Sequence, residues 1–166
     1  MDLIVAVSRA WGIGKDGGQL FFIPEDLQFF KETTWGQTVL LGRRTLAALP
    51  GGRPLPGRHS IVLSRDKTLL VPGAQVCHSL PQLLRAAKEA PGEVWVMGGA
   101  QLYRLLLPYC RRALVTKIAA DVPADVYFPN LDALPSWRLV HAGPQRSWKE
   151  GTFSFCTYEN EEAAPW

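Results

Sequence analysis

Residues 3–7 of this 166-residue chain, Leu-Ile-Val-Ala-Val, form an unbroken apolar run that includes β-branched side chains. A strand with one face in water alternates apolar and polar residues, whereas an unbroken run is typical of a strand covered on both faces. Such strands lie inside parallel or mixed sheets that carry helices on each side. The run therefore predicts an α/β fold in which the chain begins in the middle of its sheet.

The rest of the chain supplies further strands and helices in alternation. We expect strands at residues 38–41, 60–64, 93–97 and 113–118, a short strand that ends at residue 77, and helices that begin near residues 24, 42, 80 and 100. The segments 137–142 and 152–158 alternate in polarity with no helix between them, so they predict an antiparallel hairpin at the sheet edge.

Composition narrows the class of protein. With 47% hydrophobic and 20% charged residues, the sequence is typical of one soluble globular domain. The net charge of +3 is small and scattered, and does not favour a nucleic-acid partner. Cys77, Cys110 and Cys156 show neither a disulfide framework nor zinc-ligand spacing, so we expect buried thiols, no metal site and a reducing cytoplasm. No basic signal-peptide start and no apolar run of membrane-spanning length is present.

A helix that begins at Pro24 carries a carboxylate where its apolar face should be. Pro24 suits the first helical position, and Ile23, Leu27 and Phe30 recur at helical spacing. Asp26 lies four residues before Phe30 and therefore on the same side of the helix. A carboxylate that faces inward must be paired or hydrogen-bonded, or else its pKa rises. Asp26 is thus a candidate site residue; the alternative is that it only caps the first turn.

Residues 8–19 are rich in glycine and contain Gly-Ile-Gly-Lys-Asp-Gly at 12–17, a literal match to the dinucleotide-binding fingerprint. That fingerprint must lead directly into a helix, but here several residues separate it from Pro24. We therefore interpret the stretch as a mobile lid beside the inward-facing acid, and not as a dinucleotide-binding turn.

Three further features suit anionic ligands. Gly-Arg-Arg-Thr at 42–45 follows a strand and opens a helix, where N–H groups and guanidiniums suit a phosphate; a solvated basic turn is the alternative. Gly98 and Gly99 stand between a strand and a helix, where they let a ligand approach closely or form a tight turn without one. Arg58 ends a stiff loop of Pro and Gly, ready to hold a carboxylate.

These segments, in this order and spacing, resemble dihydrofolate reductases of the bacterial chromosomal type from about residue 3 to about residue 158. The matching motifs are Trp-Gly-Ile-Gly at 11–14, Ile-Pro-Glu-Asp-Leu at 23–27 with Phe-Lys at 30–31, Leu-Gly-Arg-Arg-Thr at 41–45, Arg-Pro-Leu-Pro-Gly-Arg at 53–58, Ile-Val-Leu-Ser at 61–64, Val-Met-Gly-Gly-Ala at 96–100 with Tyr103, Thr116, and Phe-Pro at 128–129.

The resemblance implies a fold in more detail. It is a single three-layer α/β domain over residues 1–160, with a central mixed eight-stranded sheet that is mostly parallel, has a C-terminal antiparallel strand and is flanked by about four helices. Residues 161–166 are expected to form a frayed tail.

The resemblance also implies the site residues. Asp26 would be the catalytic acid facing the pterin ring, with Thr116 supporting it. The substrate would contact Ile4, Val5, Leu27, Phe30, Leu49, Arg58, Met97 and Tyr103. Arg58 in particular would hold the glutamate α-carboxylate. NADPH would contact Ala6, Ile13, Gly14, Gly42, Arg43, Arg44, Thr45, Leu63, Ser64, Arg65, Gly98, Gly99, Ala100, Gln101 and Leu102. The Gly98–Gly99 peptide would be cis.

The implied reaction is NADPH-dependent reduction of dihydrofolate to tetrahydrofolate, by hydride transfer to C6 with protonation at N5, for one-carbon metabolism. The pterin amino group and its neighbouring ring N–H form a two-donor edge, which the Asp26 carboxylate can accept with both oxygens. Arg43, Arg44 and Arg65 favour a cofactor with an extra 2′-phosphate, so NADP and not NAD. The implied enzyme is a cytoplasmic monomer that binds dihydrofolate and antifolate inhibitors, without nucleic acid or membrane.

The chain departs from the family pattern near the lid. Leu20-Phe21 stands where the family often has Pro-Trp, so an indole N–H that would hold a site water is absent. Gln19 or Leu20 occupies a position where Met is common, and Ala124 replaces a common Gly. These departures concern the lid, the site water and antifolate sensitivity.

Two alternatives to this function stay open at the level of sequence. One is a related reductase of the same fold that acts on a ribosylated pyrimidine, against which Asp26 and Arg58 both argue. The other is a non-catalytic module that binds a pterin or a nucleotide. Turnover of dihydrofolate with NADPH separates the three.

Overall fold

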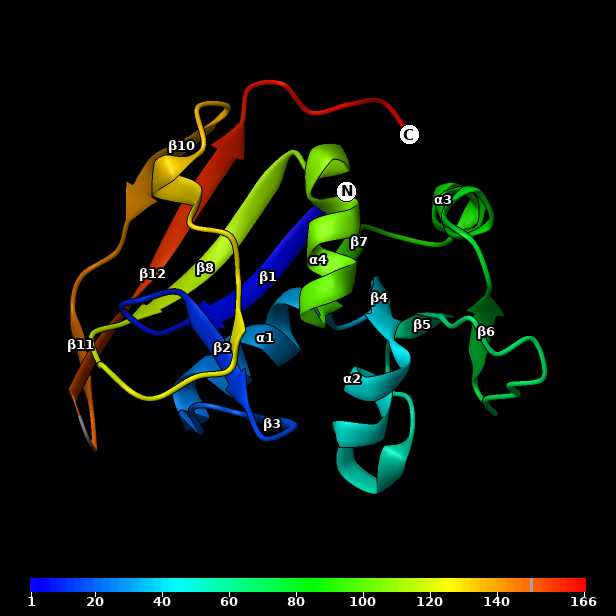
Figure 1. Cartoon of the computed structure of the whole chain (residues 1–166), viewed down its shortest axis with the longest axis horizontal. Helices are drawn as coiled ribbons and strands as arrows, with labels where there is room; N and C mark the ends of the chain where they lie inside the picture. Colours follow the sequence, from blue (N-terminus) through cyan, green and yellow to red (C-terminus); the bar gives the residue numbers. More distant parts are fainter. Residues whose placement is uncertain (150) are drawn as a thin grey trace.

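The computed structural model describes residues 1–149 and 151–166 and has three layers, a central sheet with helices on both faces (Figure 1). The sheet runs in the order β10-β12-β8-β1-β7-β4-β5-β6, and β11 pairs with β12 as a ninth strand. The eight-stranded path confirms the expected mixed, mostly parallel sheet. The added strand β11 was not expected from the sequence.

Six parallel strands build the part of the sheet that carries the candidate site. They are β1 (Asp2–Val7), β4 (Thr38–Gly42), β5 (His59–Leu63), β6 (Ala74–Cys77), β7 (Val94–Gly98) and β8 (Arg112–Ile118). Because β1 pairs with β7 on one side and β8 on the other, the chain begins in the middle of its sheet, as predicted. The carboxyl ends of such strands meet at one edge, where α/β proteins bind ligands.

The C-terminal strands run the other way. Strand β12 (Gly151–Asn160) is antiparallel to β8, and β10 (Trp137–Ala142) and β11 (Arg146–Trp148) each pair antiparallel with β12. The predicted hairpin at the sheet edge is therefore confirmed. These strands extend the sheet beside β8, which contains the expected site residue Thr116.

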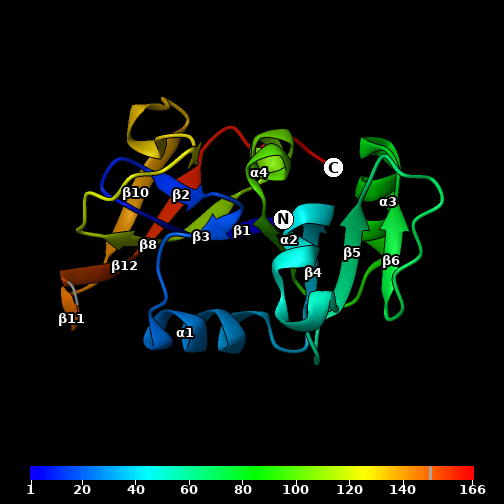
Figure 2. The ribbon, with the colours of Figure 1, turned by 60° about the horizontal axis from the view of Figure 1, so that its bottom comes forward.

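The helices divide between the two faces, as Figure 2 shows. Helices α1 (Pro24–Thr34) and α2 (Arg43–Ala48) cover the face on which Ile4 packs with Leu46 and Phe29. Helices α3 (Leu80–Glu89) and α4 (Ala100–Leu106) cover the opposite face, where Leu3 and Val5 pack. Short 3-10 turns lie at Pro50–Gly52, Leu107–Tyr109 and Leu131–Ala133. Because side chains alternate along β1, Ile4 faces the candidate site, whereas Leu3 and Val5 face the core on the other side of the sheet.

The glycine-rich stretch differs from the loop that we expected. It forms β2 (Gly12–Lys15) and β3 (Gly18–Gln19), which make a small sheet with β9 (Val126–Tyr127). Asp16 and Gly17 both have positive φ, 52° and 80°, as the two central residues of a type I′ hairpin require. The stretch opens no helix, so the dinucleotide-binding interpretation is excluded, as the sequence indicated.

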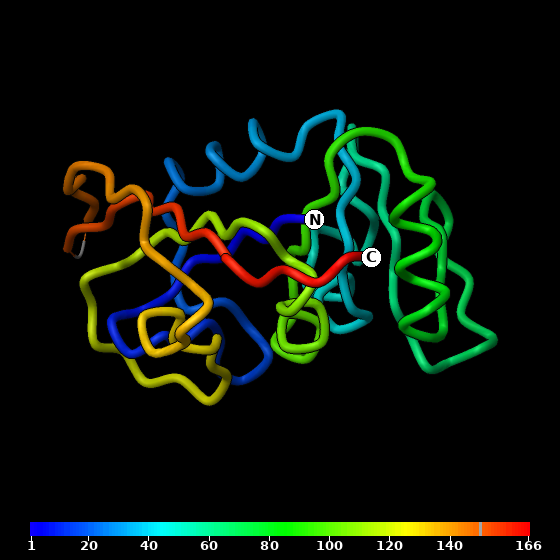
Figure 3. The backbone as a smooth tube through the Cα atoms, turned by 90° about the horizontal axis from the view of Figure 1, so that it is seen from above, coloured from blue at the N-terminus to red at the C-terminus, as the bar shows by residue number. Residues whose placement is uncertain are grey.

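The C-terminal tail, which we expected to fray, instead lies against the domain. The Ala164 N–H donates to the Pro108 carbonyl at 2.8 Å, and Trp166 packs partly buried on the core that contains Leu3. Met1 and Trp166 line one cavity of about 250 Å³, and Figure 3 shows the two termini near each other. Burial of the apolar Trp166 indole stabilises the docked tail.

The sequence also predicts buried, free cysteines without a metal site or a membrane-spanning segment. The three cysteines are free and buried, as predicted. Across residues 1–149 and 151–166, His, Cys, Asp and Glu side chains form no group of three or more that could hold a metal ion. None of the helices in those two ranges has the length and apolar character needed to cross a membrane.

Candidate active site

Asp26 lies in the first turn of helix α1 and reaches the sheet from there. Pro24 occupies the first turn and Ile23 is the N-cap residue, without a side-chain capping bond. Asp26 Oδ1 instead accepts a 2.6 Å hydrogen bond from Thr116 Oγ1 on β8. Burial raises the pKa of the Asp26 carboxyl, and the Thr116 hydrogen bond opposes that rise. The carboxylate is therefore a sheet-facing group and not a cap.

An apolar cluster lies on the same face of the sheet. Ile4, Phe30, Leu49 and Met97 come from four elements or their ends and pack in this single cluster. Leu27, one residue after Asp26, keeps 38% of its surface exposed. Large apolar side chains that stay open beside an inward carboxylate suit a flat, mostly apolar ligand with one polar edge.

Val5 and Tyr103, also expected to contact the substrate, lie on the other face of the sheet. Both belong to the core that includes Leu3, and Tyr103 is 4% exposed. The Tyr103 hydroxyl donates a 2.6 Å hydrogen bond to the Ile4 carbonyl, and burial raises the pKa of the phenol. In this structure Tyr103 thus holds β1 in place behind the apolar cluster.

The expected cofactor residues meet at the carboxyl ends of adjacent strands. Residues 42–45 follow β4, residues 64–65 follow β5, and residues 98–101 end β7 and open α4. The Gly98–Gly99 peptide is cis, as expected. A Cβ built on Gly99 would come within 3.2 Å of Thr45 Oγ1, so the two turns approach closely. Among the other expected cofactor residues, Leu102, Ile13 and Leu63 pack on the core that contains Leu3, and Ala6 packs against the cluster of Ile23, Ile118 and Phe153.

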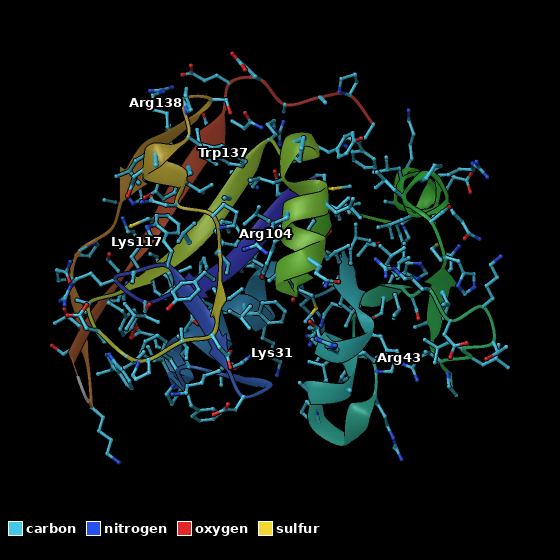
Figure 4. All side chains as sticks on the ribbon, in the orientation of Figure 1. Lys31, Arg43, Arg104, Lys117, Trp137 and Arg138 are labelled. Atoms are coloured by element: carbon cyan, nitrogen blue, oxygen red, sulfur yellow. The ribbon has the colours of Figure 1, made fainter. Side chains whose placement is uncertain are left out.

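Positive charge surrounds these turns. Arg43, Arg44 and Arg65 are exposed, and Figure 4 labels Arg43 where α2 begins. Arg43 Nη1 lies 3.3 Å from Asp66 Oδ2. Hydrogen bonds from Thr68 and the Arg43 charge lower the pKa of the Asp66 carboxyl. Solvent-exposed guanidiniums beside glycine turns are suited to a phosphate group.

Arg58 directly precedes β5. Its Nε and Nη1 atoms are buried and have no hydrogen-bond partner among the described residues. Burial lowers the pKa of this guanidinium, which stays protonated at neutral pH. A hollow of about 710 Å³ is lined by residues 52–58 and 71–73, but by neither Asp26 nor Thr116. The hollow therefore marks the Arg58 loop and does not include the Asp26–Thr116 pair.

The departures near the lid also have a structural setting. Phe21 packs edge-to-face on Trp148 with ring centroids 6.0 Å apart. Ala124 lies against the hairpin, since a Cβ built on Gly12 would come within 2.7 Å of Ala124 Cβ. Sequence reasoning missed Trp35, whose ring lies beside Arg58. Its position four residues after Lys31, directly after the last residue of α1, was the available signal.

The half-buried Asp26 carboxylate and the apolar cluster lie on one face of the sheet, and glycine turns with exposed arginines follow neighbouring strands. This combination on a doubly covered sheet is typical of α/β oxidoreductases that bind a ring substrate beside a nucleotide. The family model described as dihydrofolate reductase matches residues 1–160. The chain belongs to the dihydrofolate reductase family.

Relatives support this assignment along the chain. The dihydrofolate reductase of Mycobacterium leprae is 48% identical over 136 residues, which cover 80% of this chain and 82% of that protein. The dihydrofolate reductase of Bacillus subtilis is 35% identical over 166 residues, which cover 99% of this chain and 96% of that protein. The similarity therefore extends through the whole domain.

A solved structure gives the same result for the fold. Dihydrofolate reductase from Enterococcus faecalis, complexed with NADP(H) and RAB-propyl, superposes with a TM-score of 0.86 at 31% identity. The match covers 96% of this chain and 95% of that chain. The three-layer arrangement seen here is thus the fold of that enzyme.

Proposed function

We propose that the chain catalyses the NADPH-dependent reduction of 7,8-dihydrofolate to 5,6,7,8-tetrahydrofolate, by hydride transfer to C6 with protonation at N5, for one-carbon metabolism. The observation that carries the proposal is the Thr116–Asp26 hydrogen bond, which fixes a carboxylate of raised pKa beside an apolar cluster. Membership of the family and the NADP(H) complex of the Enterococcus faecalis enzyme support it.

Asp26 recognises the polar edge of the substrate. The pterin amino group and the adjacent ring N–H point two donors in one direction, and a carboxylate accepts both. The Thr116 hydroxyl donates a hydrogen bond to Asp26 Oδ1 and so restricts the orientation of the carboxylate. Ile4, Phe30 and Met97 enclose the rings and exclude water from them.

Asp26 assists the proton transfer without making it directly. A carboxylate bound to the pyrimidine edge is too far from N5 to reach it, so a water molecule delivers the proton. The charge of Asp26 stabilises the protonated pterin, and protonation at N5 makes C6 more electrophilic. Arg58 holds the glutamate α-carboxylate through its buried, unpartnered Nε and Nη1 atoms.

The turns at the carboxyl ends of β4, β5 and β7 fit NADPH. Gly99 lets the turn after β7 approach Thr45 in the turn after β4, since a Cβ on Gly99 would press on Thr45. Arg43 and Arg65, with Ser64, provide donors for a 2′-phosphate. Bound NADPH would supply the hydride. The chain's part is to align the two rings and keep the site dry.

One assay tests the proposal. The purified protein is incubated with dihydrofolate and NADPH, and cofactor oxidation is followed by absorbance. Turnover supports the proposal, whereas binding of dihydrofolate without turnover favours a non-catalytic module, and turnover of only a ribosylated pyrimidine favours the related reductase. A repeat with NADH measures the cofactor preference. Size-exclusion chromatography of the same sample tests the expectation of a monomer. The free, buried thiols support the separate expectation of a reducing cytoplasm.

A further inference from the structure

Trp35 sits where α1 ends, and its ring is fixed despite being 52% exposed. The indole lies directly on Gly57, because a Cβ built on Gly57 would come within 2.5 Å of the six-membered ring. The Gly36 N–H donates a 2.7 Å hydrogen bond to the Gly57 carbonyl, which ties the end of α1 to the loop before Arg58. The helix end and that loop are therefore joined at this ring.

Two cations lie over the same indole. Arg58 Cζ is 5.3 Å from the ring centroid and Lys31 Nζ is 5.7 Å from it. Figure 4 labels Lys31, which comes from α1. Among the described residues neither cation has a carboxylate within ion-pair distance. Two like charges gathered on one ring repel each other, and a bound anion would relieve that repulsion.

We propose that Trp35 is a positioning residue for Arg58, which it holds in the orientation that binds the carboxylate tail of the substrate. The inference rests on the proposed function, because the tail is that of dihydrofolate. The guanidinium packs on the indole face while its buried Nε and Nη1 atoms stay unpaired for a ligand. Lys31 adds a second positive charge at the same place.

The competing role is purely structural. If the indole only filled space on Gly57, its loss would weaken the domain and affect every substrate alike. A positioning role affects only ligands that use Arg58. Substrates with and without the carboxylate tail therefore separate the two roles.

The test compares Trp35→Leu and Trp35→Phe with the wild-type enzyme. The substrates are dihydrofolate and a 7,8-dihydropterin that lacks the benzoylglutamate tail. Because a cation–π contact contributes about 0.5–2 kcal/mol, Trp35→Leu should raise the KM for dihydrofolate roughly twofold to thirtyfold. We expect a much smaller change in kcat, no change in the KM for the tail-less pterin, and near-wild-type values for Trp35→Phe, which keeps an aromatic face.

Two controls complete the experiment. Leu139→Ala removes another exposed apolar side chain, on β10 at the opposite end of the sheet order from β5. It should change neither the KM nor the kcat for dihydrofolate. In an Arg58→Met background Trp35→Leu should add no further rise in KM, since the residue that it positions is gone.

Each outcome bears on the inference. An equal rise in KM for both substrates, a large fall in kcat, or a full additional loss in the Arg58→Met background would overturn it and leave Trp35 a structural residue. If wild-type protein fails to turn over dihydrofolate, the proposed function itself fails. Wild-type turnover with an unaltered Trp35→Leu enzyme rejects the positioning role alone.

Discussion

Thr116 Oγ1 donates a 2.6 Å hydrogen bond to Asp26 Oδ1, which joins the strand β8 to the helix α1 across 90 residues of sequence. The two effects on this carboxyl oppose each other. Desolvation is the larger and raises the pKa of Asp26, while the hydroxyl stabilises the ionised form. The fold therefore favours the protonated carboxyl more than water does, and the Thr116 hydrogen bond offsets part of that preference.

Asp26→Asn should lower turnover of dihydrofolate at neutral pH by about a hundredfold to a thousandfold, the usual cost of losing one group that stabilises charge in the transition state. The amide fills the same space but carries no charge and offers one acceptor oxygen in place of two. Steady-state kinetics at saturating NADPH measures the loss. Unchanged turnover would remove Asp26 from the mechanism.

The same variant should be no less stable than wild type at neutral pH. Since the native pKa of Asp26 is raised, the folded chain binds its proton at a pH where the unfolded chain has released it. Wild-type stability therefore falls relative to Asp26→Asn as pH rises from the ordinary range of Asp through the raised native pKa. Chemical unfolding at several pH values measures the free energy of unfolding of both proteins. The advantage of Asp26→Asn over wild type should grow as pH rises, and an advantage that shrinks would contradict the prediction.

Thr116→Val should raise the native pKa of Asp26 further, because the hydrogen bond that stabilises the ionised carboxyl is lost. A hydrogen bond to a charged group contributes about 1.5–3 kcal/mol, so kcat/KM should fall roughly tenfold or more. Carboxyl-carbon NMR titration measures the pKa directly. Thr116→Ser keeps the hydroxyl and should stay close to wild type; an equal effect in both variants would point to packing.

Arg65→Ala should raise the KM for NADPH about tenfold and leave the KM for NADH nearly unchanged, since a charge-assisted phosphate contact is lost only with the phosphorylated cofactor. Arg43→Ala should act in the same direction. The control is Arg138→Ala, which breaks an exposed ion pair with Glu161 on the C-terminal part of the sheet. Equal losses with both cofactors would place the arginines elsewhere than at the 2′-phosphate.

The sequence predicted the sheet and the acid because both have local signals. The run Leu3–Val7 shows burial on both faces, and the spacing of Asp26 and Phe30 places them on one side of α1. Two features had no such signal. Tyr103 lies in a helix whose other inward residues are apolar. The apolar pattern therefore does not distinguish a residue that lines the ligand site from one that hydrogen-bonds the Ile4 carbonyl from the opposite face of the sheet. The third strand of the small sheet is the other feature: Asp16 and Gly17 are a local signal for the hairpin, but β9, which completes the sheet, lies more than 100 residues away in the sequence.

Gly12→Ala should destabilise the hairpin by about 1–3 kcal/mol, the usual cost of overpacking. The added methyl would stand 2.7 Å from Ala124 Cβ and 2.9 Å from Ser8 Oγ, both too close for ordinary contact. Thermal unfolding and kcat measure the effect on fold and lid. Ala124→Gly added to Gly12→Ala should restore part of the loss; no rescue would show that other neighbours of Gly12 cause it.

Trp166→Ala should lower the free energy of unfolding by about 1–2 kcal/mol, less than for a fully buried Trp because the indole is only partly covered. The midpoint of thermal unfolding should fall by about 2–8 °C for a domain of this size. Turnover should not change, since Trp166 lies beside Met1, at the opposite ends of the parallel strands from Gly98 and Gly99. Glu162→Ala alters an exposed tail side chain and serves as the control. A frayed tail would leave both variants as stable as wild type, whereas a docked tail separates them, because only the indole removes apolar area from water.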